Sequence, residues 1–188
     1  MERREAVKYV SLLLGGTLVG ATSFLTGCHT EEKHSGRAFT QDDYAYLDEI
    51  GETILPATST PGAKAAKVGQ FMTVMVNDCY TDKDQSIFKD GMDKINDLSK
   101  KKYDQAFMAI NPQQRHDLLV QLDKEQKDYT KNKKPEDAAH YFRMMKELTL
   151  LGYFTSEIGC KQARRYVPVP GRYDGCIPYK KGDKAFAS

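Results

Sequence analysis

The sequence predicts an all-α fold of about five helices in a compact bundle, followed by an extended Pro/Gly-rich C-terminal tail. Apolar residues recur at spacings of three and four from Tyr44 onward, and typical helix-capping residues precede several of these segments. No segment of useful length alternates apolar and polar residues as a strand would. The 188 residues are 40% apolar, enough for one core, so we expect a single domain over residues 40–188.

The first two helices are expected on either side of a proline-containing loop. Thr40 followed by Gln41, Asp42 and Asp43 predicts an N-cap with acidic residues in the first turn. The loop LPATSTPGA is expected to end this helix, and a second helix is predicted from about Lys67. The apolar face of the first comprises Tyr44, Leu47, Ile50 and Ile54, and that of the second comprises Val68, Phe71, Met72, Met75, Val76 and Cys79.

Three further helices follow. Thr81 predicts the cap of the third, KKKYDQAFMAI reads as a surface turn leading to a short helical segment, and Asn111-Pro112 predicts the start of the fourth. Pro135 is expected to start the last helix, which would run to about Gly159. The predicted inner faces comprise Ile87, Phe88, Met92, Ile95 and Leu98, then Leu118, Leu119, Leu122 and Tyr129, then Tyr141, Phe142, Met145 and Leu148.

A stripe of small residues marks the last predicted helix. Thr149, Gly152, Ser156, Gly159 and Ala163 are spaced by three and four, which would let another helix or chain segment approach closely. Glycine costs about 1 kcal/mol relative to alanine inside a helix, so two on one face need a gain in packing. Internal packing and a partner surface formed by Gly152, Ser156 and Gly159 both remain open.

The tail, KQARRYVPVPGRYDGCIPYKKGDKAFA, cannot be helical for long because of its prolines and turn-forming glycines. Tyrosine and arginine on a stiff, extended segment are typical of protein interfaces. We therefore take Arg165, Tyr166, Pro170, Gly171 and Tyr173 as candidate partner-binding residues. The alternative is a tail that wraps its own domain.

The first 27 residues are typical of a signal peptide. Arg3, Arg4 and Lys8 precede an apolar segment that ends in Leu-Thr-Gly-Cys, as in a bacterial lipoprotein signal, which predicts cleavage before Cys28 and its lipidation. An uncleaved anchor helix is the alternative. The paired arginines match part of a twin-arginine export signal, although Glu2 and Ala6 depart from that pattern, so a general secretion signal is also possible. Residues 28–39 are predicted to be a polar linker.

Charge and motifs exclude several function classes. The chain carries a formal charge of +2, and the part from Cys28 onward about +1, so no nucleic-acid partner is expected. The sequence has no G-x-G-x-x-G after a strand, P-loop, C-x-x-C or H-E-x-x-H motif, and we assign no catalytic, cofactor-binding or metal-binding residue. His116 and His140 are expected on the exposed surface.

Three cysteines remain beyond Cys28. In an exported protein, an odd number suggests one disulfide and one further thiol. A Cys160–Cys176 bond would close a loop of about 15 residues and stabilise the fold by about 3 kcal/mol, and Cys79–Cys176 is the rival pairing. Cys79 lies on the predicted apolar helix face, where an inert, buried thiol is the expected outcome.

Three stretches in order, ETILPATSTPGA (52–63), LTLLGYFTSEIG (148–159) and VPGRYDGC (169–176), resemble the gluconate 2-dehydrogenase subunit 3 family. The resemblance implies a non-catalytic small subunit of a membrane-associated sugar dehydrogenase. It also implies a large GMC-type partner subunit that holds FAD, sometimes with a haem-containing electron-transfer subunit, while this chain holds no cofactor and supports export, maturation and anchoring. We expect a membrane-tethered lipoprotein of the cell envelope that faces the periplasm. The alternative function is an independent envelope lipoprotein that acts as a scaffold or binding module.

Overall fold

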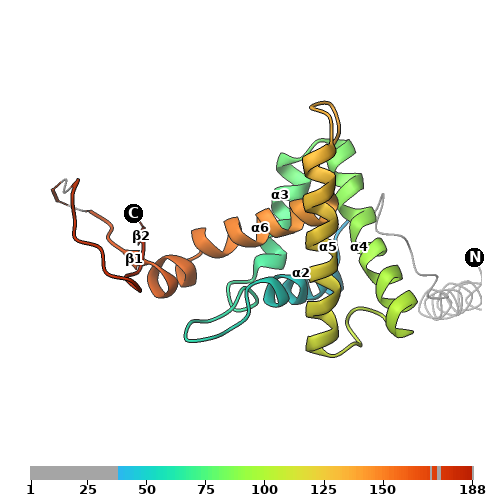
Figure 1. Ribbon diagram of the computed structural model, residues 1–188, viewed down its shortest axis with the longest axis horizontal. Helices are drawn as coiled ribbons and strands as arrows, with labels where there is room; N and C mark the ends of the chain where they lie inside the picture. Colours follow the sequence, from blue (N-terminus) through green and yellow to red (C-terminus); the bar gives the residue numbers. More distant parts are fainter. Residues whose placement is uncertain (1–37, 170, 173–174, 188) are drawn as a thin grey trace, which may run out of the picture. The chain divides into compact units, whose positions relative to one another are not determined.

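Helices make up most of the computed structural model, which describes residues 38–169, 171–172 and 175–187 (Figure 1). These residues belong to one compact unit, Lys33–Ser188, and the prediction of an all-α fold is confirmed. The only strands among them, β1 and β2, have two residues each. The elements are α2 (Gln41–Ile54), α3 (Val68–Cys79), α4 (Asp82–Tyr103), α5 (Pro112–Asn132), α6 (Tyr141–Thr155), the short π-helix η1 (Gly159–Ala163), β1 (Arg165–Tyr166) and β2 (Phe186–Ala187).

The predicted caps begin three of the helices. At the start of α2, the Asp43 backbone N–H donates to Thr40 Oγ1 and the Thr40 N–H donates to Asp43 Oδ2 at 2.7 Å, which forms a capping box. Asn111 and Gln114 form a second box at the start of α5. Thr81 caps α4. Each cap satisfies a backbone N–H that lacks a partner within its helix.

The remaining two helices begin differently. The backbone of Lys67 is left-handed just before α3, and the Gly69 N–H donates to Asp48 Oδ1 of α2 at 2.7 Å. The predicted start of the last helix at Pro135 is wrong, because α6 begins at Tyr141. The Asp137 carboxylate accepts from the Lys134 N–H at 2.8 Å, and this local turn competes with helix formation.

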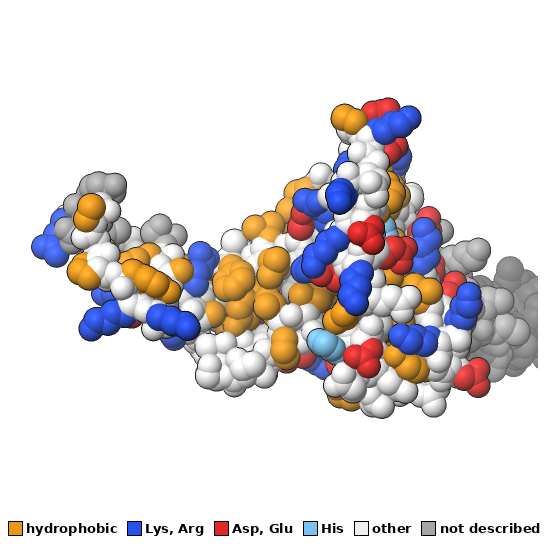
Figure 2. Space-filling view, viewed as in Figure 1, with side chains coloured by type: hydrophobic (Ala, Val, Ile, Leu, Met, Phe, Trp, Pro, Cys, Tyr) orange, Lys and Arg blue, Asp and Glu red, His pale blue; other side chains and the backbone are white. Residues whose placement is uncertain are grey.

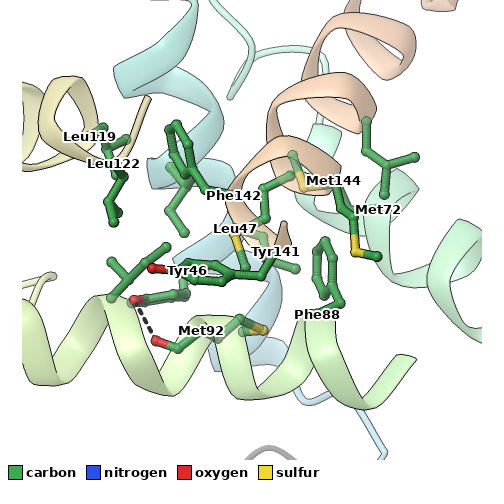
Figure 3. Packing of buried hydrophobic residues seen from close by; sticks show 14 of the residues in the cluster. Tyr46, Leu47, Met72, Phe88, Met92, Leu119, Leu122, Tyr141, Phe142 and Met144 are labelled. Carbon is green, nitrogen blue, oxygen red and sulfur yellow. Dashed lines mark hydrogen bonds between the residues drawn. The ribbon is translucent and has the colours of Figure 1, made fainter. Parts of the chain in front are cut away.

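One apolar core joins the five α-helices (Figure 3). The Tyr46 hydroxyl lies among these side chains and donates to the Met92 carbonyl at 3.1 Å, which satisfies a buried polar group. The predicted inner faces are mostly confirmed, but Tyr129 is 40% exposed. Fully buried members include Leu47, Ile50, Val68, Met72, Val76, Phe88, Met92, Ile95 and Met145.

The connection between α4 and α5 also contributes to the core. The KKK stretch predicted as a surface turn belongs to α4, which continues to Tyr103. Phe107 and Ile110 in the connection are buried, and the Phe107 N–H donates to Asn96 Oδ1 at 3.0 Å. Since this segment has no helical periodicity, its burial was not visible in the sequence.

The last helix ends earlier than predicted. α6 stops at Thr155, and Ser156 has an extended backbone with ψ 159. Ser156 Oγ donates to the Tyr153 carbonyl at 2.7 Å and accepts from the Gly159 N–H at 3.0 Å, so it closes one helix and leads into the next turn. None of the helices in the described ranges has the length and apolarity needed to span a membrane.

Candidate partner-binding surface

Exposed apolar side chains gather over α6 and over the C-terminal tail, residues 161–188 (Figure 2). On α6, Leu150 and Leu151 are exposed. In the tail, Val169 is 79% and Tyr179 is 76% exposed, and Tyr166, Ile177 and Phe186 are exposed as well. Apolar side chains that stay exposed in several neighbouring segments are typical of an interaction surface.

Two short strands near the two ends of the tail pair with each other. The strands β1 and β2 pair in parallel, with the Arg165 N–H donating to the Ala185 carbonyl and the Val167 N–H donating to the Ala187 carbonyl, both at 2.8 Å. The Arg165 guanidinium lies 4.7 Å from the centre of the Phe186 ring. The chain from Val167 to Lys184 is therefore a loop whose two ends are held together.

Arg164 connects this loop to the end of α6. Its Nη2 donates to the Phe154 carbonyl, and its guanidinium lies 5.6 Å from the centre of the Phe154 ring. The Cys160 thiol donates to the same carbonyl at 3.2 Å. The last carbonyls of a helix lack partners within it, so these contacts both satisfy α6 and fix the start of the tail.

The small-residue stripe is used inside the chain at two of its three candidate positions. Gly152 is buried, and a Cβ placed on it would lie 2.6 Å from Phe71 Cδ1 of α3. Gly159 is also buried, and a Cβ there would lie 1.9 Å from the Tyr153 carbonyl oxygen. Both glycines thus permit close internal packing, while Ser156 is half-buried at the end of α6.

Of the tail candidates, Arg165 and Tyr166 are exposed on β1, and Gly171 is exposed with φ 73. This left-handed backbone favours glycine, since other residues adopt it at a cost. Pro170 and Tyr173 lie outside the described residues, as do Arg3, Arg4 and Cys28 of the predicted leader.

Cys79, Cys160 and Cys176 are free in the structure, so neither the Cys160–Cys176 nor the Cys79–Cys176 pairing is formed there. The expectation that Cys79 is buried is wrong, because its side chain is exposed at the C-terminal end of α3. Helical periodicity placed Cys79 on the apolar face, but Cys79 is the final residue of α3 and lies beyond Val76, the last buried residue of this helix.

A groove beside His140 was not predicted. It has a volume of about 600 Å³ and lies between α4, α5 and the start of α6. His140 Nδ1 accepts from the Phe142 N–H at 3.2 Å, and Nε2 lies 3.6 Å from Glu125 Oε1. Burial lowers the pKa of His140, and Glu125 opposes this shift. Because both ring nitrogens face groups of this chain, we interpret His140 as a structural cap.

His140 also corrects the expectation of two exposed histidines. Its side chain is only 9% exposed, whereas that of His116 is 59% exposed. The His140 ring stacks on Tyr141 at 4.3 Å between centres. A histidine directly before an apolar helical segment is the one sequence feature that could have indicated this capping role.

The N-termini of the described α-helices are capped from within the chain. Each of the five α-helices has an acceptor from this chain at its N-terminus: Thr40, Asp48, Thr81, Asn111 or His140. A helix N-terminus with free N–H groups is what commonly binds a pyrophosphate. Within the described ranges, no group of three or more His, Cys, Asp or Glu residues could hold a metal ion.

The fold and surface thus define an all-α protein with an exposed apolar and cationic C-terminal tail. A family model for gluconate 2-dehydrogenase subunit 3 matches residues 41–171, and the chain belongs to this family. The family name makes it a subunit of a multi-subunit dehydrogenase. Comparison with curated proteins and with solved structures gives no match.

Proposed function

We propose that this chain is the non-catalytic small subunit of a membrane-associated, flavin-dependent sugar dehydrogenase, and that the tail binds the FAD-bearing large subunit. The observation that carries the proposal is the exposure of Val169, Ile177 and Tyr179 on a loop closed at its base. Pairing of β1 with β2 holds the two ends of this segment together, which lowers the conformational entropy that it loses on binding, and tyrosine and arginine provide large contact areas. Family membership supports a partner that belongs to the same dehydrogenase complex.

The leader supports a role in export. A large subunit that folds around FAD before crossing the membrane needs a route for folded proteins, and the paired Arg3 and Arg4 of a bound subunit would supply the address. Lipidation at Cys28 would then hold the complex at the membrane, facing the periplasm. Two or three acyl chains give stable attachment, because each buried methylene contributes about 0.8 kcal/mol.

In this proposal, the flavin and any haem belong to the partners. Sugar oxidation then takes place on the large subunit. This chain contributes binding, membrane attachment and the export signal.

Copurification tests the proposal. The full chain, tagged after Ser188 through a flexible linker, is expressed in its native host and isolated from membranes. We expect a yellow complex that contains a large FAD protein and oxidises a sugar or sugar acid with a dye acceptor. A colourless chain without a large partner would contradict the proposal and favour an independent envelope lipoprotein.

Matched variants locate the binding surface. Ile177→Ala with Tyr179→Ala removes exposed apolar groups from the tail, and Met108→Ala with Val120→Ala removes comparable groups from the helical part. We expect the tail pair to lose the flavoprotein and the second pair to retain it. Replacing Arg3 and Arg4 by lysine tests export separately, and undiminished envelope activity in that variant would refute cotransport.

A further inference from the structure

The tail differs sharply in charge from the rest of the chain. Residues 39–160 contain 16 Lys or Arg and 20 Asp or Glu, a net charge of −4. Residues 161–188 contain seven basic residues against Asp174 and Asp183, a net charge of +5; the seven are Lys161, Arg164, Arg165, Arg172, Lys180, Lys181 and Lys184. A segment of one sign attached to a body of the other favours partners of opposite charge to the segment.

The positive charge lines a concave site. A groove of about 950 Å³ lies between η1, β1 and the returning end of the chain. Four cations line it, namely Lys161, Arg164, Arg165 and Lys184, and the one carboxylate among its lining residues is that of Asp183. The Lys161 ammonium also pairs with the exposed Glu157 carboxylate at 2.7 Å, so the excess positive charge of the groove comes mainly from Arg164, Arg165 and Lys184. The Lys184 ammonium donates to the Gln162 carbonyl at 2.5 Å, which draws the two ends of the groove together.

The groove also has apolar walls. Tyr166, Tyr179 and Phe186 line it and are exposed. Cations interspersed with aromatic side chains suit a ligand that presents carboxylates and apolar side chains together. A polypeptide segment with acidic and apolar residues has this composition.

Arg164 gives an independent indication of a missing acceptor. Its Nη2 is bonded to the Phe154 carbonyl, but its Nε is buried without a hydrogen-bond acceptor among the described residues. A buried donor without an acceptor costs about 1–3 kcal/mol, more when it is charged. Since Arg164 also lines the groove, its guanidinium charge lies close to a carboxylate bound there.

We propose that this groove binds an acidic polypeptide segment of the partner subunit. This inference rests on the proposed function for the identity of the partner, but the chemistry of the groove follows from its own residues. The concave shape favours a chain segment over an anionic membrane, because a flat lipid surface cannot reach Arg164, which is half-buried next to the end of α6. The groove would therefore add an electrostatic contact to the apolar contacts of the tail.

Peptide binding tests the groove without the partner. The protein is residues 29–188, which contain the whole compact unit Lys33–Ser188 and its core. The probe is a fluorescent decapeptide of alternating glutamate and leucine, and its counterpart has glutamine for glutamate. We expect the glutamate peptide to bind at least about tenfold more tightly at low salt, with weaker binding at higher salt because exposed charges are screened. Equal affinity for the two peptides would overturn the proposal.

Charge reversal provides the matched control. Lys161→Glu with Lys184→Glu changes two groove cations, and Lys131→Glu with Lys134→Glu makes the same charge change at exposed positions near the end of α5. We expect the first pair to lose at least about tenfold in affinity and the second to lose less than about twofold. Equal losses of affinity in both pairs would show a general effect of net charge and overturn the proposal that the peptide binds in the groove. Tighter binding of phosphatidylglycerol vesicles than of the glutamate peptide would also overturn the proposal, because it would make a membrane the preferred ligand.

Copurification separates the two proposals. If the chain copurifies with its flavoprotein but does not bind the glutamate peptide, the proposed role of the groove is refuted and the proposed function is not. A chain that binds the peptide through Lys161 and Lys184 but isolates without a flavoprotein refutes the proposed partner and leaves the chemistry of the groove standing.

Discussion

The helical body, residues 39–160, and the tail differ in the burial of their large apolar side chains. Phe88, Phe107 and Phe142 of the body are fully buried, whereas Val169 and Tyr179 of the tail are more than three quarters exposed. Burying a large apolar side chain contributes about 1.5–3 kcal/mol. The body gains this free energy on folding and the tail does not, so the tail has it available for association.

The largest expected difference comes from removing one aromatic side chain from each region. Phe88→Ala leaves a cavity among the buried side chains around Met92 and Tyr141 (Figure 3) and should lower the free energy of unfolding by about 3–5 kcal/mol. Tyr179→Ala removes an exposed ring and should change it by less than about 0.5 kcal/mol. Urea denaturation followed by circular dichroism measures both.

Tyr179→Ala could instead lower the free energy of unfolding as much as Phe88→Ala does. In that case the tail would pack on the body in solution. Its exposure in the structure would then not describe the isolated protein.

A second prediction concerns the glycine between α3 and α6. Gly152→Val places methyl groups against the Phe71 ring, where even a Cβ would lie 2.6 Å away, and should destabilise the fold by about 1–3 kcal/mol. Leu151→Val, at the exposed neighbouring position, should cost less than about 1 kcal/mol. If Gly152→Val instead left stability unchanged and abolished copurification of the large subunit, Gly152 would belong to the partner surface.

The helical fold could be predicted because its determinants are local. Thr40, Thr81 and Asn111 cap their helices through residues three positions away, and the apolar spacing specifies the core face. The end of α6 could not be predicted, since the small-residue spacing continues through Ser156 whereas its hydroxyl ends the helix. A side chain that bonds its own backbone leaves no mark in hydrophobic periodicity.

The candidate surface could be predicted only in part. The composition of the tail made Arg165 and Tyr166 candidate partner-binding residues; both are exposed in the structure, and their binding to a partner stays a prediction. The groove depends on the pairing of β2 with β1, in which Phe186 lies opposite Arg165. These residues are 21 positions apart, and no short sequence pattern encodes such a contact. Lys184 joins the groove for the same reason, and the sequence alone did not single it out.

A third, smaller effect comes from an ion-pair cluster in the helical body. Burial raises the pKa of Asp123, but hydrogen bonds from Lys127, Lys146 and Gln126 outweigh it and lower the pKa to about 2. The stabilisation is present above the ordinary value of about 3.9 and is lost as the pH falls toward about 2. Because the side chain is 21% exposed and solvent screens the cluster, we expect about 1 kcal/mol.

Asp123→Asn tests this cluster. The variant should be less stable than the parent near neutral pH, and the difference should shrink between about pH 4 and about pH 2. Glu136→Gln, at an exposed position, is the control and should change stability by less than about 0.5 kcal/mol. A difference between Asp123→Asn and the parent that stays constant across this range would mean that the carboxylate charge contributes nothing.

The smallest expected effect lies at the start of α6. Burial lowers the pKa of His140, and its unprotonated Nδ1 accepts from the Phe142 N–H. The neutral ring therefore stabilises the fold fully above the ordinary pKa of about 6.5, and this contribution is lost as the pH falls below that value. His140→Asn retains a capping acceptor that does not titrate.

Between about pH 7 and about pH 5, the parent should lose about 0.5 kcal/mol more stability than His140→Asn. His116→Asn, at an exposed position, should follow the parent. Chemical denaturation at several pH values in this range measures the difference. A parent that gains stability as the pH falls would mean that attraction between the protonated ring and Glu125 outweighs the lost cap. The helical body would then have a charged groove beside His140, as the tail has beside Arg164, and the two regions would differ less.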